Sequence, residues 1–167
     1  MFDEELTEIS RLTLEAFRTA GKTIATAESC TGGMIAALLT EIPGSSDVYS
    51  YGFVTYSNEA KTELLGVSED ILQSVGAVSA ETALAMASGA RNSIGADVAV
   101  AVTGVAGPGG GSDEKPVGTV FLAVAAGEEL GSFVEKFEFG DIGRTKIRRE
   151  TTKEALEMLL SYGLDEQ

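Results

Sequence analysis

Residues 97–103 read Asp-Val-Ala-Val-Ala-Val-Thr, and their pattern indicates the fold class. Its five central residues are all apolar, which is typical of a strand buried on both faces. Strands of that kind lie inside α/β sheets, where helices cover both sides. We therefore expect residues 97–103 to form a buried strand, with the flanking segments supplying its neighbours and the covering helices.

The apolar spacing on either side of this strand predicts the remaining elements. Strands are expected at residues 22–27, 51–57, 118–125 and 132–139. Helices are expected from Phe2 to Gly21 and at residues 34–42, 58–66, 79–94 and 144–162, with Asn58 and Ser79 as N-caps. Helices alternate with strands early, whereas the last strands follow each other closely. This order predicts a three-layer α/β/α sandwich with a mixed sheet of about five strands, in one domain over residues 1–167.

The composition limits the kinds of partner. The 167 residues include 12 Lys and Arg and 26 Asp and Glu, so the formal net charge is −14. A chain this acidic is repelled by nucleic-acid phosphates and by anionic lipid. The N-terminus lacks the features of a signal peptide, and no apolar stretch approaches the roughly 20 residues that a membrane span needs. We therefore expect a cytoplasmic protein that binds neither nucleic acid nor membrane.

Two rare residue types limit the chemistry. The chain has no His and one Cys. These counts exclude a Ser-His-Asp triad, Cys-His catalysis, His-ligated metal and Cys-rich zinc sites. If the chain is a hydrolase, its base must be Lys, Tyr, Asp or Glu.

The segment Ala-Glu-Ser-Cys-Thr-Gly-Gly, residues 27–33, places Ser29 at a predicted strand-to-helix turn. Unpaired N–H groups and the dipole at the start of the helix would favour an oxyanion or a phosphate there. Taken alone, this segment favours a helix N-cap as the role of Ser29. Cys30 is a competing nucleophile, because a thiol near a helix N-terminus can have a lowered pKa, but it ranks below Ser29 without a His partner.

Lys61 is a candidate base. It lies near the start of the predicted helix 58–66, where the dipole disfavours a cation and partial burial would lower its pKa further. A neutral lysine can accept the proton of a serine hydroxyl. The alternative is a solvated lysine paired with Glu59 or Glu63.

Two further segments offer ligand contacts. Arg144 and Arg148 are four residues apart on the apolar side of the last helix, which is typical either of an anion clamp or of ion pairs with acidic residues. The glycine-rich stretch 103–112 follows the buried strand and does not match a dinucleotide fingerprint. The Thr103 hydroxyl and the Gly104 N–H could instead face a ligand.

Taken together, these motifs resemble the CinA C-terminal domain family. They are AESCTGG, PGSS at residues 43–46, GFVTYSNEAK, GAVS at residues 76–79, TGVAGPGGG and EKPVGTV, and the resemblance runs from about Ile9 to Leu160. It implies hydrolysis of the carboxamide of nicotinamide mononucleotide to nicotinate mononucleotide and ammonia, in pyridine nucleotide recycling. It also implies Ser-Lys hydrolysis without metal or cofactor, with Ser29 as nucleophile, Lys61 as base and Tyr56 as helper.

The expected substrate contacts are Cys30, Thr31, Gly32, Gly33, Gly44, Ser45, Ser46, Thr103, Gly104, Arg144 and Arg148. Lys115 joins Arg144, Arg148 and the N–H groups of residues 44–46 as a candidate for the phosphate. The chain departs from the family at Ile142 and Gly143, which are inserted before Arg144.

Two other functions stay open, a non-catalytic nucleotide-binding or regulatory module and an amidase for another small amide. A homo-oligomer is also compatible with the sequence.

Overall fold

The computed structural model describes residues 2–127 and 130–164. Five strands form one sheet in the order β2-β1-β3-β4-β5. Their bounds are β1 (Ile24–Glu28), β2 (Tyr49–Val54), β3 (Val98–Gly104), β4 (Thr119–Ala125) and β5 (Ser132–Glu138). β1 pairs parallel with β2 and β3, whereas β3–β4 and β4–β5 are antiparallel. The predicted mixed sheet of five strands is confirmed.

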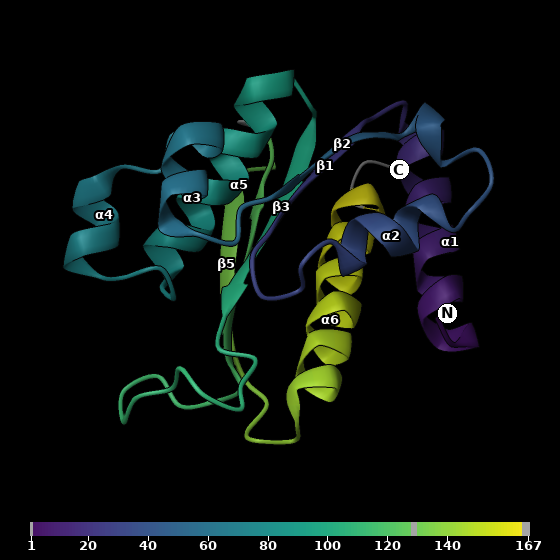
Figure 1. Cartoon of the computed structure of the whole chain (residues 1–167). Helices are drawn as coiled ribbons and strands as arrows, with labels where there is room; N and C mark the ends of the chain where they lie inside the picture. The colour runs from purple at the N-terminus through teal and green to yellow at the C-terminus, as the bar shows by residue number, and fades with distance from the viewer. Residues whose placement is uncertain (1, 128–129, 165–167) are drawn as a thin grey trace.

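Helices cover both faces of this sheet. They are α1 (Glu4–Ala20), α2 (Met34–Thr40), α3 (Asn58–Leu65), α4 (Glu69–Ser74), α5 (Ala80–Ile94) and α6 (Arg144–Leu164). Figure 1 shows α1, α2 and α6 on one side of the strands and α3, α4 and α5 on the other. The three-layer α/β/α sandwich is therefore confirmed.

The alternation of Val and Ala in β3 divides the core in two. Val98, Val100 and Val102 pack with large side chains of the α1, α2 and α6 layer. Ala99 and Ala101 pack with small residues of the α5 layer. Because successive side chains of a strand point to opposite faces, one strand serves a bulky layer and a close-packed layer.

Several local expectations are wrong in detail. The helix α4 and a short 3₁₀ turn at Ser45–Asp47 were not expected. The N-cap of α3 is Ser57, whose side chain accepts from the Ala60 N–H at 3.1 Å, rather than Asn58. Within the described ranges, no helix combines the length and the apolar character that crossing a membrane requires.

The parallel strands fix where a ligand can lie. β1, β2 and β3 run in the same direction, so their carboxyl ends meet at one edge of the sheet. Crevices outside the carboxyl ends of such strands are the usual binding places of α/β sheets. The segments that leave β1, β2 and β3 there carry Ser29, Tyr56 and Val105.

Candidate active site

A cavity of about 280 Å³ opens at this edge of the sheet. Three of the segments with predicted site residues meet in it, together with the glycine-rich loop and the start of α6. The residues that line it are Ser29, Cys30, Tyr56, Asn58, Lys61, Ala77, Val78, Thr103, Gly104, Val105, Ala106, Gly107, Gly109, Gly110 and Arg144. The cavity therefore joins residues that lie more than 100 positions apart in the chain.

Ser29 and Lys61 lie side by side in this cavity. The Lys61 Nζ and Ser29 Oγ atoms are 3.2 Å apart, within hydrogen-bond distance. The turn that carries Ser29 is tied to the sheet, because the Ser29 N–H donates to the Val102 carbonyl at 3.0 Å. The hydroxyl and the amine thus have the separation expected of a nucleophile and its base.

Lys61 is buried without an opposite charge. Its side chain is 1% exposed, and its amine donates to the carbonyls of Thr55 at 2.8 Å and Ser57 at 3.4 Å. No carboxylate of the described residues forms an ion pair with it, so the alternative of a solvated lysine paired with Glu59 or Glu63 is wrong. Burial lowers the pKa of the Lys61 amine, because desolvation penalises the ammonium.

The three hydrogen-bond partners of Lys61, the carbonyls of Thr55 and Ser57 and the Ser29 hydroxyl, also fix the orientation of a neutral amine. A neutral amine has two N–H donors and one lone pair. Two carbonyl oxygens can only accept, so they use the two N–H groups, and the lone pair is left for the Ser29 hydroxyl. The arrangement allows the serine to donate its proton to the lysine.

Burial has the opposite effect on the pKa of Cys30. Its side chain is 5% exposed, and burial raises the pKa of the thiol to about 12. A reactive cysteine needs a lowered pKa, so this thiol is protonated and inert near neutral pH. The structure favours Ser29 over Cys30 as the nucleophile.

Glu28, next to Ser29, is a residue that sequence reasoning missed. Its carboxylate is fully buried and accepts four hydrogen bonds, from the Thr31 hydroxyl at 2.7 Å and from the N–H groups of Gly33, Ile35 and Ala36 at 2.9, 3.1 and 2.8 Å. The N–H groups at the start of α2 therefore bind Glu28, and the expected use of the Gly33 N–H for an oxyanion is wrong. An acidic residue directly before a turn into a helix was the available signal.

Arg144 links three walls of the cavity. Its guanidinium donates to the Gly107 carbonyl at 2.8 Å and to the Tyr56 hydroxyl at 2.9 Å. The Tyr56 side chain is 59% exposed, so its hydroxyl stands at the mouth of the cavity. The start of α6, the glycine-rich loop and the segment after β2 are held together by this one side chain.

Thr103 and Lys115 each donate a hydrogen bond to the connection between α4 and α5. The Thr103 hydroxyl donates to the Ala77 carbonyl at 2.7 Å, and the Lys115 ammonium donates to the Val75 carbonyl at 2.7 Å. Thr103 and Gly104 line the cavity, whereas Lys115 does not. Lys115 thus holds the glycine-rich loop against the connection between α4 and α5.

Other expected contacts lie outside the cavity. Arg148 donates to the Thr31 carbonyl at 2.7 Å, and it lines a separate groove with Gly32 and Gly33. Residues 44–46 precede β2 and so lie at the opposite end of the sheet, where the Gly44 carbonyl accepts from Arg18. The structure does not bring Thr31, Gly32, Gly33, Gly44, Ser45, Ser46 or Arg148 into the cavity that holds Ser29.

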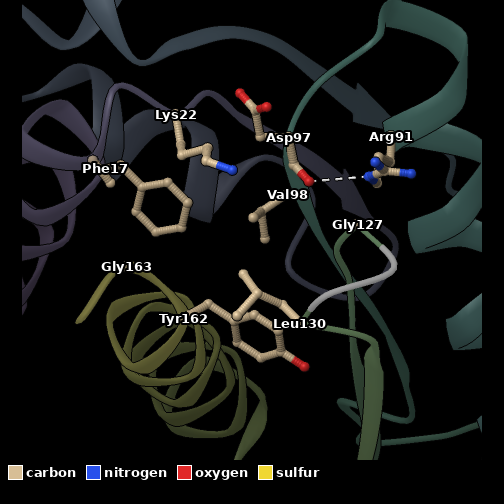
Figure 2. A pocket seen from close by; sticks show the side chains of 10 residues that line it. Phe17, Lys22, Arg91, Asp97, Val98, Gly127, Leu130, Tyr162 and Gly163 are labelled. Carbon is tan, nitrogen blue, oxygen red and sulfur yellow. Dashed lines mark hydrogen bonds between the residues drawn. The ribbon is translucent and has the colours of Figure 1, made fainter. Parts of the chain in front are cut away.

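A second cavity, of about 210 Å³, lies at that opposite end (Figure 2). Phe17, Val98 and Tyr162 give it an apolar lining, and Arg91 donates to the Asp97 carbonyl at 3.0 Å beside it. Among the described residues that line it, none is Ser, Thr or Cys. The carboxyl edge is the better candidate active site, because its cavity places the Ser29 hydroxyl beside the Lys61 amine.

The fold and the first cavity define an α/β/α protein that holds a serine against a buried lysine at the carboxyl edge of its sheet. The sequence model of the CinA C-terminal domain matches residues 6–162, so the chain belongs to this family. The resemblance inferred from the motifs is confirmed.

Two curated relatives of this chain differ in length. The nicotinamide-nucleotide amidohydrolase PncC of Escherichia coli K12 is 46% identical over 159 residues, which make up 95% of this chain and 95% of that protein. The CinA-like protein of Geobacter sulfurreducens is 52% identical over 92% of this chain, but the matched part is 35% of its own length. The chain thus spans about a third of the longer curated relatives.

Solved structures show the same fold. The competence/damage inducible protein CihA of Agrobacterium tumefaciens superposes with a TM-score of 0.93 at 52% identity, covering 96% of this chain and 97% of that one. A CinA superfamily protein of Escherichia coli superposes with a TM-score of 0.86 at 32% identity, covering 97% and 94%.

Proposed function

We infer that the chain hydrolyses the carboxamide of nicotinamide mononucleotide to nicotinate mononucleotide and ammonia, as a step of pyridine nucleotide recycling. The observation that carries this proposal is the 3.2 Å approach of the Lys61 amine to the Ser29 hydroxyl within a cavity. The substrate is suggested by PncC, which matches this chain over 95% of both lengths and is named a nicotinamide-nucleotide amidohydrolase.

The first half of the reaction forms an ester. Neutral Lys61 takes the Ser29 proton as Ser29 Oγ attacks the amide carbon. The C–N bond then breaks, and the Lys61 ammonium returns the proton to the departing nitrogen, which leaves as ammonia. Lowering of the Lys61 pKa by burial makes the neutral amine available for the first proton transfer.

The oxyanion formed on attack needs donors within the cavity. Backbone N–H groups of Cys30 and Gly104 are the proposed donors, because both residues line the cavity and the Gly33 N–H is bound to Glu28. One such donor contributes roughly 2.7–4 kcal/mol to transition-state stabilisation.

The second half of the reaction hydrolyses the ester. Lys61, neutral again after ammonia has left, takes a proton from water as the water oxygen attacks the ester carbon. The C–O bond to Ser29 breaks, and the proton returns to Ser29 Oγ. The products are the free carboxylate and the original hydroxyl, with one proton released.

Tyr56 and Arg144 complete the proposed site at its mouth. The Tyr56 hydroxyl, which accepts a hydrogen bond from Arg144, is the proposed helper of proton transfer to the leaving ammonia. Arg144 and Lys61 are the basic residues among the described lining residues, and Arg144 is exposed whereas Lys61 is buried. Arg144 is therefore the proposed contact for the substrate phosphate.

A substrate panel tests this function. Ammonia release would be measured from nicotinamide mononucleotide, nicotinamide riboside and nicotinamide at equal concentrations. We expect the mononucleotide to have the highest kcat/KM, because only it offers a phosphate to Arg144. Release from another amide but not from the mononucleotide would assign a different amidase, and binding of the mononucleotide without release would assign a non-catalytic module.

A further inference from the structure

The side chain of Lys61 runs back toward the start of α3. Its amine contacts the carbonyls of Thr55 and Ser57, and both of these residues precede Asn58, the first residue of the helix. Long side chains of a helix commonly point toward its N-terminus and cover the preceding turn. The amine that meets the Ser29 hydroxyl therefore lies beside the first residue of α3, one turn before the backbone of Lys61.

Asn58 shares this part of the helix surface with Lys61. The two residues are three positions apart, which makes their side chains neighbours on one face of α3, and both line the cavity that holds Ser29. The N-cap of α3 is Ser57, whose hydroxyl accepts from the Ala60 N–H, so helix capping does not occupy the Asn58 carboxamide. Asn58 thus brings a hydrogen-bonding group to the reactive amine.

Asn58 also brings this group without a charge. The nearby positions Glu59 and Glu63 of α3 are exposed carboxylates. A carboxylate at position 58 would stabilise the Lys61 ammonium and raise its pKa, against the lowering that burial causes. A carboxamide has one acceptor oxygen and two N–H donors, so it can contact a substrate while the Lys61 amine stays neutral.

The Asn58 carboxamide matches the part of an amide substrate that distinguishes it from an ester. A primary carboxamide carries two N–H donors on the nitrogen that leaves, whereas an ester has an oxygen there and no donor. The leaving nitrogen must also lie near the Lys61 amine, which returns the proton to it in the proposed reaction. Because Asn58 lies beside that amine, its Oδ1 atom is a suitable acceptor for an N–H group of the leaving nitrogen.

We propose that Asn58 selects primary carboxamides over esters, with its Oδ1 atom accepting a hydrogen bond from the leaving –NH₂ group. This contact holds the nitrogen beside Lys61, whose ammonium protonates it. The C–N bond then breaks, its electron pair stays with the nitrogen, and ammonia leaves, while Asn58 itself exchanges no proton. The inference rests on the proposed hydrolysis and concerns which leaving group the same site accepts.

Two substrates that differ only in the leaving group test this role. They are nicotinamide mononucleotide and the methyl ester of nicotinate mononucleotide, and liquid chromatography follows the nicotinate mononucleotide formed from each, with uncatalysed hydrolysis subtracted. Asn58→Leu keeps the size of the side chain and removes its hydrogen bonds, and Asn92→Leu is the matched control at an exposed position of α5. For Asn58→Leu, we expect kcat/KM to fall about tenfold for the amide and to stay within about twofold for the ester. Asn92→Leu should change neither.

Other outcomes would overturn the proposal. Equal losses on both substrates would show that Asn58 acts through the position of Lys61 rather than on the leaving group, and unchanged rates on both would show that it does not contact the substrate. If circular dichroism shows that Asn58→Leu does not fold, Asn58→Ala takes its place, with the same expected ratio of amide to ester cleavage. Failure of the proposed function is seen in the intact chain itself, which would then not cleave the mononucleotide, and the inference would fall with it.

Discussion

Glu28 and Lys61 are both buried, and each neighbours Ser29 in a different way. Glu28 precedes Ser29 in the chain and accepts four hydrogen bonds from the turn and from the start of α2. Lys61 comes from α3, meets two carbonyls and the Ser29 hydroxyl, and has no carboxylate partner among the described residues. The Glu28 carboxylate thus has four hydrogen-bond donors around it, whereas the Lys61 amine has no carboxylate partner among the described residues.

This difference separates a structural group from a reactive one. A carboxylate that accepts four hydrogen bonds holds the groups around it in place. An amine that is desolvated without an opposite charge has a lowered pKa and can act as a base. Removing Glu28 should therefore cost stability, whereas removing Lys61 should cost activity.

The largest effect is expected for Lys61→Met, which keeps most of the side-chain volume and removes the base. Loss of a general base lowers the rate by about 10²–10⁴-fold, so kcat should fall by about 10³-fold. The free energy of unfolding should stay within about 1 kcal/mol, because relief of the amine's desolvation offsets its lost hydrogen bonds. Steady-state ammonia release and urea unfolding measure both quantities, with Lys136→Met as the control. A large loss of stability with activity retained would show that Lys61 has a structural role and is not the base.

Glu28→Gln should show the opposite pattern. The amide N–H₂ would face one of the four donors, and the negative charge at the start of α2 would be lost. We expect the free energy of unfolding to fall by about 2–4 kcal/mol. Urea denaturation checks this against Glu63→Gln, the same change at an exposed position. A variant as stable as the intact chain would show that the four hydrogen bonds do not hold the turn.

The pH dependence of activity reports the pKa of the Lys61 amine. Lys61 is protonated below its lowered pKa and cannot then accept the Ser29 proton. The value of kcat/KM should therefore fall about tenfold per pH unit as the pH drops below this pKa, and level off above it. A pH–rate profile of the intact chain measures the midpoint. A midpoint at the ordinary lysine value of 10.5 would contradict the effect of burial.

The smallest effect concerns Tyr56 and Arg144, which share one hydrogen bond at the mouth of the cavity. Tyr56→Phe and Arg144→Lys should each lower kcat/KM about tenfold, as expected for one lost hydrogen bond to a charged group. The double variant should lose less than the product of the two, because both changes remove the same contact. Arg91→Lys is the control, since Arg91 also donates to a backbone carbonyl, but in the cavity at the opposite end. Fully multiplicative losses would show that Tyr56 and Arg144 act separately.

The fold could be predicted from the sequence because its strands carry a strong local pattern. The apolar stretch 97–103 became β3, and the small face of residues 79–94 became the side of α5 that packs on the sheet. The helix α4 was missed because it buries none of its residues and so shows no apolar face.

Local sequence patterns could predict single residues of the candidate site, but not their arrangement in space. Ser29 and Lys61 each had a local signal, but their distance depends on how β1 and α3 pack, which no local pattern contains. Residues 44–46 were assigned to the substrate site although they precede β2, while Ser29 follows β1. Since β1 and β2 are parallel, those positions lie at opposite ends of the sheet, so topology could have excluded that assignment.

The most direct test of the central claim is ammonia release from nicotinamide mononucleotide by the intact chain, Ser29→Ala and Ser74→Ala, with and without a chelator. The proposed mechanism requires release by the intact chain and by Ser74→Ala, insensitive to chelator, and none by a folded Ser29→Ala. Release by Ser29→Ala at the rate of the intact chain would contradict the assignment of Ser29 as the nucleophile.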